Sequence, residues 1–125
     1  SLKQKPMHTN NTINYVEFPA SNMEATKAFF SAVFGWSFED FGPAYTAFSE
    51  AGLDGGVFSS QDSSKTASGS ALVVLYSNEL EAVQARIEQA GGTIVESIFA
   101  FPGGRRFHFT EPSGTELAIW AETGE

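Results

Sequence analysis

Few residues of this chain are suited to chemistry, and most of them interrupt apolar stretches. The chain has 2 histidines and no cysteine, so thiolate nucleophiles, thiolate metal sites and disulfide frameworks are excluded. His108 follows Arg106 at alternate positions of RRFHF, Glu17 lies within NYVEF, and Glu116 begins ELAIW. A histidine with carboxylates can serve as a general base or hold a divalent cation, and an arginine can anchor an anionic group.

Each of these side chains also has a purely structural interpretation. Glu17 is either paired with Arg106 or free to act as a base, because a carboxylate within an apolar strand is costly unless it is paired. His108 is either a hydrogen-bonded filler of a wet cavity or a ligand-binding or catalytic group. Glu116 is either a pocket carboxylate or an exposed strand end beside the EPSG turn. Spacing alone leaves these alternatives open.

The overall composition limits the class of partner. The 125 residues are 42% hydrophobic, which predicts one domain with a sizeable core. Lys and Arg total 7 against 15 Asp and Glu, and the resulting net charge of −8 disfavours nucleic acid and anionic membrane surfaces. No apolar run approaches the roughly 18 residues of a membrane helix, and no signal peptide is recognisable. We therefore expect a cytoplasmic protein.

Two helices are predicted at equivalent places in the two halves of the chain. Each begins at a capping box, in which a polar side chain and a glutamate three residues later bond each other's backbone amides. The boxes are Ser21 with Glu24 and Asn78 with Glu81. Apolar residues at helical spacing follow each box, and the stretches end at Gly35 and at Gly91–Gly92.

Strand-like runs flank both helices in the same order. The predicted strands are residues 12–18, 37–40, 45–49 and 55–58 in the first half, and 71–76, 93–99, 105–110 and 116–121 in the second. Residues 1–11 are interpreted as a disordered or non-native tail, and the serine-rich residues 59–70 as a linker. We predict an α+β fold of two βαβββ modules, about 12–58 and 71–122, whose curled mixed sheets enclose a cavity with the helices outside.

This repeat and two motifs resemble the vicinal oxygen chelate superfamily, which includes glyoxalases, bleomycin resistance proteins and extradiol dioxygenases. The motifs are the helix ending AFFSAVFGW and the segment RRFHFTEPSGTELAIW, and the likeness extends to bacterial single-domain proteins labelled glyoxalase-related. It implies a divalent metal bound by His and Glu side chains at four positions, here Tyr15, Gly56, Leu72 and Ala118. Only Tyr15 is even a marginal ligand, so we predict that the usual metal is missing and, with it, glyoxalase chemistry.

Strand alternation defines the predicted pocket. If Tyr15 faces the cavity, so do the residues two positions away on the same strand and their counterparts on neighbouring strands. The expected lining is Tyr15, Glu17, Leu72, Val74, Tyr76, Arg106, His108, Glu116 and Trp120. Most of the 12 phenylalanines are expected in the core.

Two functions of different class follow from this pocket. The first is a protein that binds an aromatic or cationic small molecule without a cofactor, as likeness to the bleomycin resistance branch implies. The alternative is a lyase-, isomerase- or dioxygenase-like enzyme with Glu17 and His108 as catalytic residues. It would work either without metal or with a divalent metal displaced to Glu17, His108 and Glu116. The resemblance also implies a homodimer, with the pocket inside one chain or across the two-fold axis.

Overall fold

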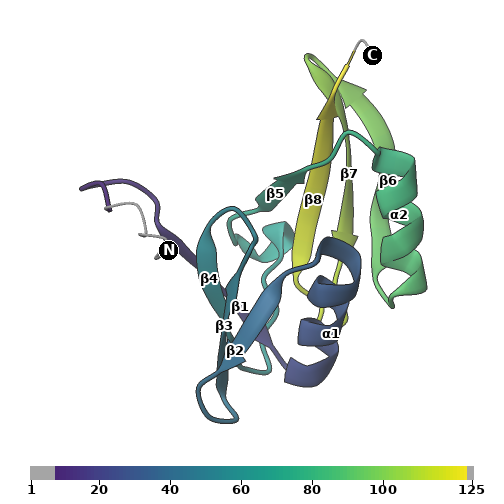
Figure 1. Ribbon diagram of the computed structural model, residues 1–125. Coiled ribbons are helices and arrows are strands. Elements are labelled where there is room, and N and C mark those ends of the chain that lie inside the picture. Colours follow the sequence, from purple (N-terminus) through teal and green to yellow (C-terminus); the bar gives the residue numbers. More distant parts are fainter. Residues whose placement is uncertain (1–7, 124–125) are drawn as a thin grey trace, which may run out of the picture.

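The computed structural model describes residues 8–123, and it consists of two four-stranded mixed sheets with one helix each (Figure 1). The first module contains β1 (Tyr15–Ala20), α1 (Met23–Phe34), β2 (Ser37–Asp40), β3 (Tyr45–Ser49) and β4 (Asp54–Ser59). The second contains β5 (Val73–Tyr76), α2 (Leu80–Gln89), β6 (Thr93–Phe101), β7 (Gly104–Thr110) and β8 (Glu116–Glu122). A short 3-10 turn, Thr66–Ser68, lies between them. Neither helix in this part of the chain has the length and apolarity needed to cross a membrane.

The two modules have the same topology, as the sequence repeat predicts. Strand order is β1-β4-β3-β2 in the first sheet and β5-β8-β7-β6 in the second. In each sheet the first strand runs parallel to the last, and the remaining neighbours are antiparallel. The α+β fold of two βαβββ modules is therefore confirmed. The sheets share no hydrogen-bonded strands and do not close into a barrel.

The helix starts differ from the predicted capping boxes. The cap of α1 is Asn22, whose side-chain oxygen accepts from the Ala25 amide at 3.1 Å, and not Ser21. The cap of α2 is Glu79, which makes no side-chain capping bond, and not Asn78. Each helix thus begins one residue late for a capping box, which displaces the glutamate from the position that reaches back to the cap. The predicted end of α1 at Gly35 is confirmed, with φ 75° in the left-handed region.

Aromatic rings fill the core between the helices and the sheets. Trp36 stacks on Phe30 at 4.4 Å and on Phe48 at 4.7 Å between ring centroids, which ties the end of α1 to β3. Phe29 of α1 also contacts Phe109 of β7 at 6.0 Å. As predicted, most phenylalanines belong to this core, and α1 packs against both modules.

The EPSG turn that precedes β8 joins the two modules. Glu111 is only 3% exposed, and its carboxylate accepts from the Thr26 hydroxyl of α1 at 2.6 Å and from the Thr115 amide at 2.8 Å. Ser113 accepts from the Asn22 amide at 3.1 Å. A buried carboxylate held by neutral donors in this way fixes the turn against the start of α1.

The segments outside the modules are also defined in part. The first seven residues of the predicted tail lie outside the described residues, and residues 8–14 form a turn that delays β1 to Tyr15. Within the serine-rich linker, the Ser64 carbonyl accepts from the Glu116 amide at 2.7 Å. The linker thus runs along the start of β8 and positions donors beside Glu116.

Candidate functional site

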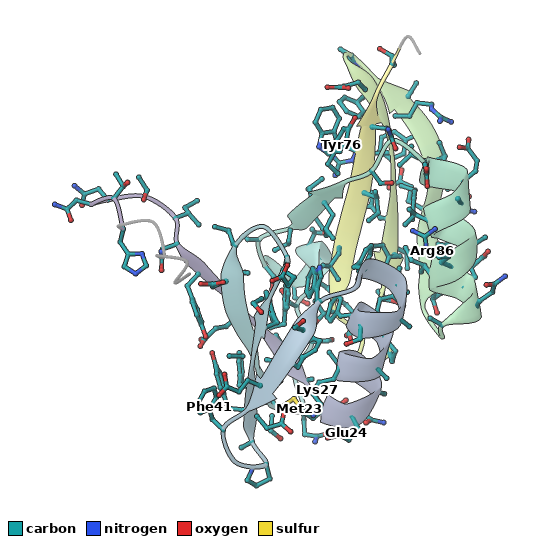
Figure 2. All side chains as sticks on the ribbon, in the orientation of Figure 1. Met23, Glu24, Lys27, Phe41, Tyr76 and Arg86 are labelled. Atoms are coloured by element: carbon teal, nitrogen blue, oxygen red, sulfur yellow. The ribbon has the colours of Figure 1, made fainter. Side chains whose placement is uncertain are left out.

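Each sheet has one face covered by its helix and one open face. Side chains on the open faces are unusually exposed for their type, with Tyr15 at 45% and Tyr76 at 50%. Figure 2 shows Tyr76 projecting from β5 on the side away from α2. The cross-strand registers place Arg106 beside Trp120 and His108 beside Ala118, on the same open face as Tyr76 and Val74. The predicted strand faces are thus correct.

On the open face of the first sheet, Tyr45 links Tyr15 and Glu17. The Tyr45 hydroxyl donates to Glu17 Oε2 at 2.9 Å, so it accepts from the Tyr15 hydroxyl at 2.7 Å. Burial, followed by these two hydrogen bonds, raises the pKa of Tyr45 well above its usual range. A side chain at Gly56 would overlap the Tyr45 hydroxyl, so the glycine makes the space that the Tyr45 ring occupies.

The four predicted metal-ligand positions do not fit a metal ion. The Tyr45 ring fills the space in front of Gly56, which has no side chain to offer. Leu72 and Ala118 carry only hydrocarbon, and Ala118 is fully buried. Within residues 8–123, no group of three or more His, Cys, Asp or Glu side chains is placed to hold a metal. Of the four positions, Tyr15 alone carries a polar side chain, and its hydroxyl is hydrogen-bonded to Tyr45.

On the open face of the second sheet, Arg106, His108 and Glu116 form a chain of hydrogen bonds. Arg106 donates to His108 Nε2 from Nε at 3.2 Å and from Nη2 at 3.1 Å. Because Nε2 accepts, the imidazole proton is on Nδ1, which lies 3.2 Å from Glu116 Oε2. His108 is therefore neutral in this arrangement.

The linker completes this chain at its far end. Glu116 Oε1 accepts from the Thr66 amide at 2.8 Å and from the Thr66 hydroxyl at 2.9 Å. The Thr66 amide is the largest cause of a lowered Glu116 pKa, which the Thr66 hydroxyl and His108 lower further. The side chains of His108 and Glu116 are only 12% and 14% exposed. Glu116 is thus a mostly buried side chain that ties the linker to β8, and no sequence pattern indicated that Thr66 would be its partner.

The structure divides the predicted pocket residues into two groups on different sheets. Glu17 bonds Tyr45, and Arg106 bonds His108, so the ion pair considered for Glu17 and Arg106 is not formed. His108 and Glu116 are brought together, but Glu17 does not join them in a metal-binding group within the described part of the chain. Glu17 and Arg106 thus each bond a side chain of their own sheet.

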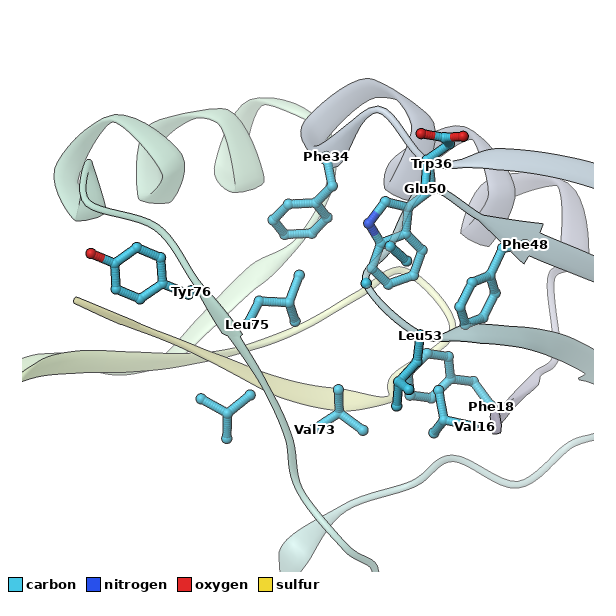
Figure 3. A pocket seen from close by; sticks show the side chains of 13 residues that line it. Val16, Phe18, Phe34, Trp36, Phe48, Glu50, Leu53, Val73, Leu75 and Tyr76 are labelled. Atoms are coloured by element: carbon cyan, nitrogen blue, oxygen red, sulfur yellow. The ribbon is translucent and has the colours of Figure 1, made fainter. Parts of the chain in front are cut away.

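An apolar pocket of about 460 Å³ lies at the junction of the modules (Figure 3). The end of α1 and the β3–β4 hairpin form one wall, and β5 forms the other (Figure 3). Its lining residues are Val16, Phe18, Phe34, Trp36, Phe48, Glu50, Ala51, Gly52, Leu53, Val73, Val74, Leu75 and Tyr76. Only Val74 and Tyr76 belong to the predicted lining.

The one charged side chain of this lining is Glu50, which lies at the rim in the β3–β4 turn. Glu50 has φ 66°, in the left-handed region that the tight turn requires. Sequence reasoning missed Phe34, Trp36 and Glu50. Phe34 belongs to a helix pattern that assigns its apolar residues to the core, Trp36 follows the end of that helix, and Glu50 lies in a turn outside any periodic pattern.

Comparisons with known proteins identify relatives of this fold. The family model of the Glyoxalase/Bleomycin resistance protein/Dioxygenase superfamily matches residues 12–119. The fosfomycin resistance protein FosX from Listeria monocytogenes is 16% identical, with a TM-score of 0.75 over 92% of this chain and 96% of that chain. A glyoxalase/bleomycin resistance protein/dioxygenase family enzyme from Burkholderia phytofirmans PsJN is 13% identical, with a TM-score of 0.74 over 88% and 98%. A lactoylglutathione lyase from Agrobacterium tumefaciens is 18% identical, with a TM-score of 0.68 over 90% and 95%. No curated protein matches the sequence significantly. At these identities the solved structures establish the fold alone.

Proposed function

Since this chain belongs to the glyoxalase/bleomycin resistance protein/dioxygenase superfamily, we propose that it is a small-molecule-binding protein whose ligand is aromatic and cationic. The observation that carries this proposal is the lining of the junction pocket. Five aromatic side chains face it, from Phe18, Phe34, Trp36, Phe48 and Tyr76. A concave, mostly apolar site with few polar groups is the usual form of a small-molecule site.

The sign of the ligand charge follows from the same lining. Glu50 is its only charged member, and aromatic faces attract cations by about 0.5–2 kcal/mol. A planar cation would stack between Trp36 on one wall of the pocket and β5 on the other, with its charge toward Glu50. The net charge of −8 also favours the approach of a cation.

We propose in addition that the protein acts as a homodimer. The open faces expose Tyr15, Phe58, Val74 and Tyr76, and Phe58 is 37% exposed. Apolar area of this kind is usually covered in a stable assembly. A second copy with its first sheet opposite this second sheet would enclose the open faces between the two chains by one two-fold operation, with a cavity left between the sheets. Sedimentation equilibrium checks this, with a monomer at micromolar concentration as the contrary result.

Catalysis by Glu17 or His108 has less support. The Glu17 carboxylate accepts from Tyr45, and Nε2 of His108 accepts from Arg106. A general base needs a free lone pair within reach of the substrate proton. The one lone pair of the His108 imidazole is taken by Arg106, so His108 would first have to lose this partner, whereas Glu17 keeps acceptor sites on its carboxylate but lies outside the lining of the junction pocket.

The binding proposal is tested by following Trp36. The chain has 2 tryptophans, so Trp120→Phe leaves Trp36 as the only one, and Trp36 lines the pocket. Proflavine, a planar cation, should quench Trp36 saturably, and the anionic dye 1-anilinonaphthalene-8-sulfonate should bind more weakly. Glu50→Gln should weaken proflavine binding by up to about fivefold, as expected for loss of one exposed charge at the rim of the pocket.

The matched control is Glu88→Gln, which makes the same charge change on the exposed side of α2. It should leave the affinity within about twofold, because exposed charges more than about 10 Å away are screened at ordinary ionic strength. Equal effects of Glu50→Gln and Glu88→Gln would contradict a specific role of the pocket. Absence of quenching by proflavine would contradict the proposed ligand class.

A further inference from the structure

We propose a second binding site, on the open face of the second sheet, that takes the carboxylate of an aromatic acid. We call it the Arg106 site and define it by Arg106, Phe99, Phe101, Tyr76 and Trp120. This inference goes beyond the proposed function, because it concerns a site that shares only Tyr76 with the junction pocket and a ligand of opposite charge.

The first step is that the charge of Arg106 is not paired. Arg105, its neighbour in sequence, forms an ion pair with Glu81 at 2.8 Å, and Lys27 forms one with Asp40 at 2.9 Å. Over residues 8–123, no carboxylate oxygen lies within 4.0 Å of an Arg106 nitrogen. The chain has 15 acidic residues and only 7 basic ones, so carboxylates are plentiful and yet none pairs with Arg106 in the described residues. The half-buried guanidinium therefore keeps its charge available.

The second step is that Arg106 is held in place by a neutral group. Its Nε and Nη2 both donate to His108 Nε2, while Nη1 has no hydrogen-bond partner in the described part of the chain. His108 is held by Glu116, which is held by Thr66. Fixing a free arginine costs up to about 2 kcal/mol of side-chain entropy, so a guanidinium that is already fixed binds an anion more tightly.

The third step is the aromatic surround. The Arg106 guanidinium lies 5.9 Å from the ring centroids of both Phe99 and Phe101. Trp120 packs edge-on against Tyr76 at 5.2 Å and beside Phe101 at 6.3 Å. These rings reduce the access of water to the charge, which strengthens its attraction for an anion.

The rings also decide which anion fits. A carboxylate can take the guanidinium fork through Nη1 and Nη2, and an attached aromatic ring can pack on Trp120 and Tyr76. Inorganic phosphate gains only the charge interaction and remains strongly hydrated. Benzoate is therefore the simplest probe of the proposed ligand class, and inorganic phosphate is the comparison.

The experiment follows Trp120. In a Trp36→Phe background, Trp120 is the only tryptophan and belongs to the Arg106 site. Benzoate should change its fluorescence saturably, with an affinity at least fivefold higher than that of phosphate. Arg106→Gln should weaken benzoate binding at least tenfold. Arg105→Gln makes the same charge change on the opposite face of β7 and should leave it within twofold.

Two variants of His108 test how Arg106 is positioned. His108→Leu removes the acceptor and should weaken benzoate binding about fivefold, whereas His108→Gln keeps an oxygen near the place of Nε2 and should restore most of it. Circular dichroism shows whether each variant folds. Four results would each overturn the proposal. They are an equal loss of benzoate affinity in both His108 variants, an equal effect of the Arg105 and Arg106 variants, phosphate binding as tight as benzoate binding, and no fluorescence response to benzoate.

The outcome is separable from that of the proposed function. Trp36, in the Trp120→Phe variant, reports the junction pocket with proflavine, and Trp120, in the Trp36→Phe variant, reports the Arg106 site with benzoate. Either response can fail while the other is present.

Discussion

Replacing Gly56 by alanine should have opposite effects on stability with and without Tyr45. The three atoms nearest to a Cβ built at Gly56 all belong to the Tyr45 side chain, and its hydroxyl would overlap that Cβ. The alanine therefore forces the Tyr45 side chain away and breaks its bonds to Glu17 and Tyr15. With Tyr45→Ala already in place, nothing is displaced.

The magnitude follows from the bonds that break. At these exposed positions the two bonds together contribute about 1.5–2 kcal/mol to the free energy of unfolding. Alanine in place of glycine within a strand raises the free energy of unfolding by about 0.5–1 kcal/mol, because a chain with alanine loses less conformational freedom when it folds. Gly56→Ala should therefore destabilise the wild type by about 1 kcal/mol and stabilise the Tyr45→Ala protein by about 0.5–1 kcal/mol. The coupling is about 1.5–2 kcal/mol.

Equilibrium unfolding in urea measures all four proteins of this cycle. The adjacent glycine gives the control, because a Cβ at Gly55 would meet the Val16 carbonyl and the Phe48 ring instead. Gly55→Ala should destabilise the protein equally with and without Tyr45. Additive effects of Gly56→Ala and Tyr45→Ala would refute the reasoning that the tyrosine fills the space in front of Gly56.

Three further predictions concern hydrogen-bonded groups. The lowered pKa of Glu116 means that its contribution to stability is present above the usual carboxyl pKa and is lost as the pH falls through the folded value. Glu116→Gln should therefore make the urea midpoint less sensitive to pH between about 5 and 3, and an unchanged pH profile would contradict this. The raised pKa of Tyr45 predicts stability that is present below about pH 10 and lost above it. Absorbance at the tyrosinate band should show less late ionisation at high pH in Tyr45→Phe than in the wild type. Thr26→Val removes the hydroxyl that donates to buried Glu111 and should cost about 2–3 kcal/mol in thermal or urea unfolding, whereas loss below 0.5 kcal/mol would mean that water replaces it.

The sequence predicted the topology because the same pattern occurs twice. Turn residues, apolar alternation and helix-ending glycines recur in both halves, and such local signals do not depend on distant contacts. Alternation also placed Arg106 and His108 on the open face, opposite Phe107 and Phe109, which are fully buried. The capping boxes failed because two polar residues adjoin each helix start, and the pattern does not decide which one is the cap.

The composition of the site was predictable only within each sheet. Alternation says which residues share a face, but it does not say which faces of two sheets meet. In the structure Glu17 therefore bonds Tyr45 and not Arg106, whereas His108 lies beside Glu116 on the same sheet. The Thr66 contact comes from a linker without periodicity. The position of Tyr45 depends on the space that Gly56 leaves on the neighbouring strand. This contact joins two strands, so the sequence of either strand alone does not predict it.

The contact of the EPSG turn with α1 has a consequence for how such a protein can diversify. The groups that join the modules, Glu111, Thr26 and the aromatic core, all lie on the helix side of the sheets. Side chains on the open faces, such as Tyr15, Glu17 and Arg106, contribute little to that junction. Mutations on the open faces therefore leave the contacts between the modules in place, and ligand preference can change while the junction and the fold persist.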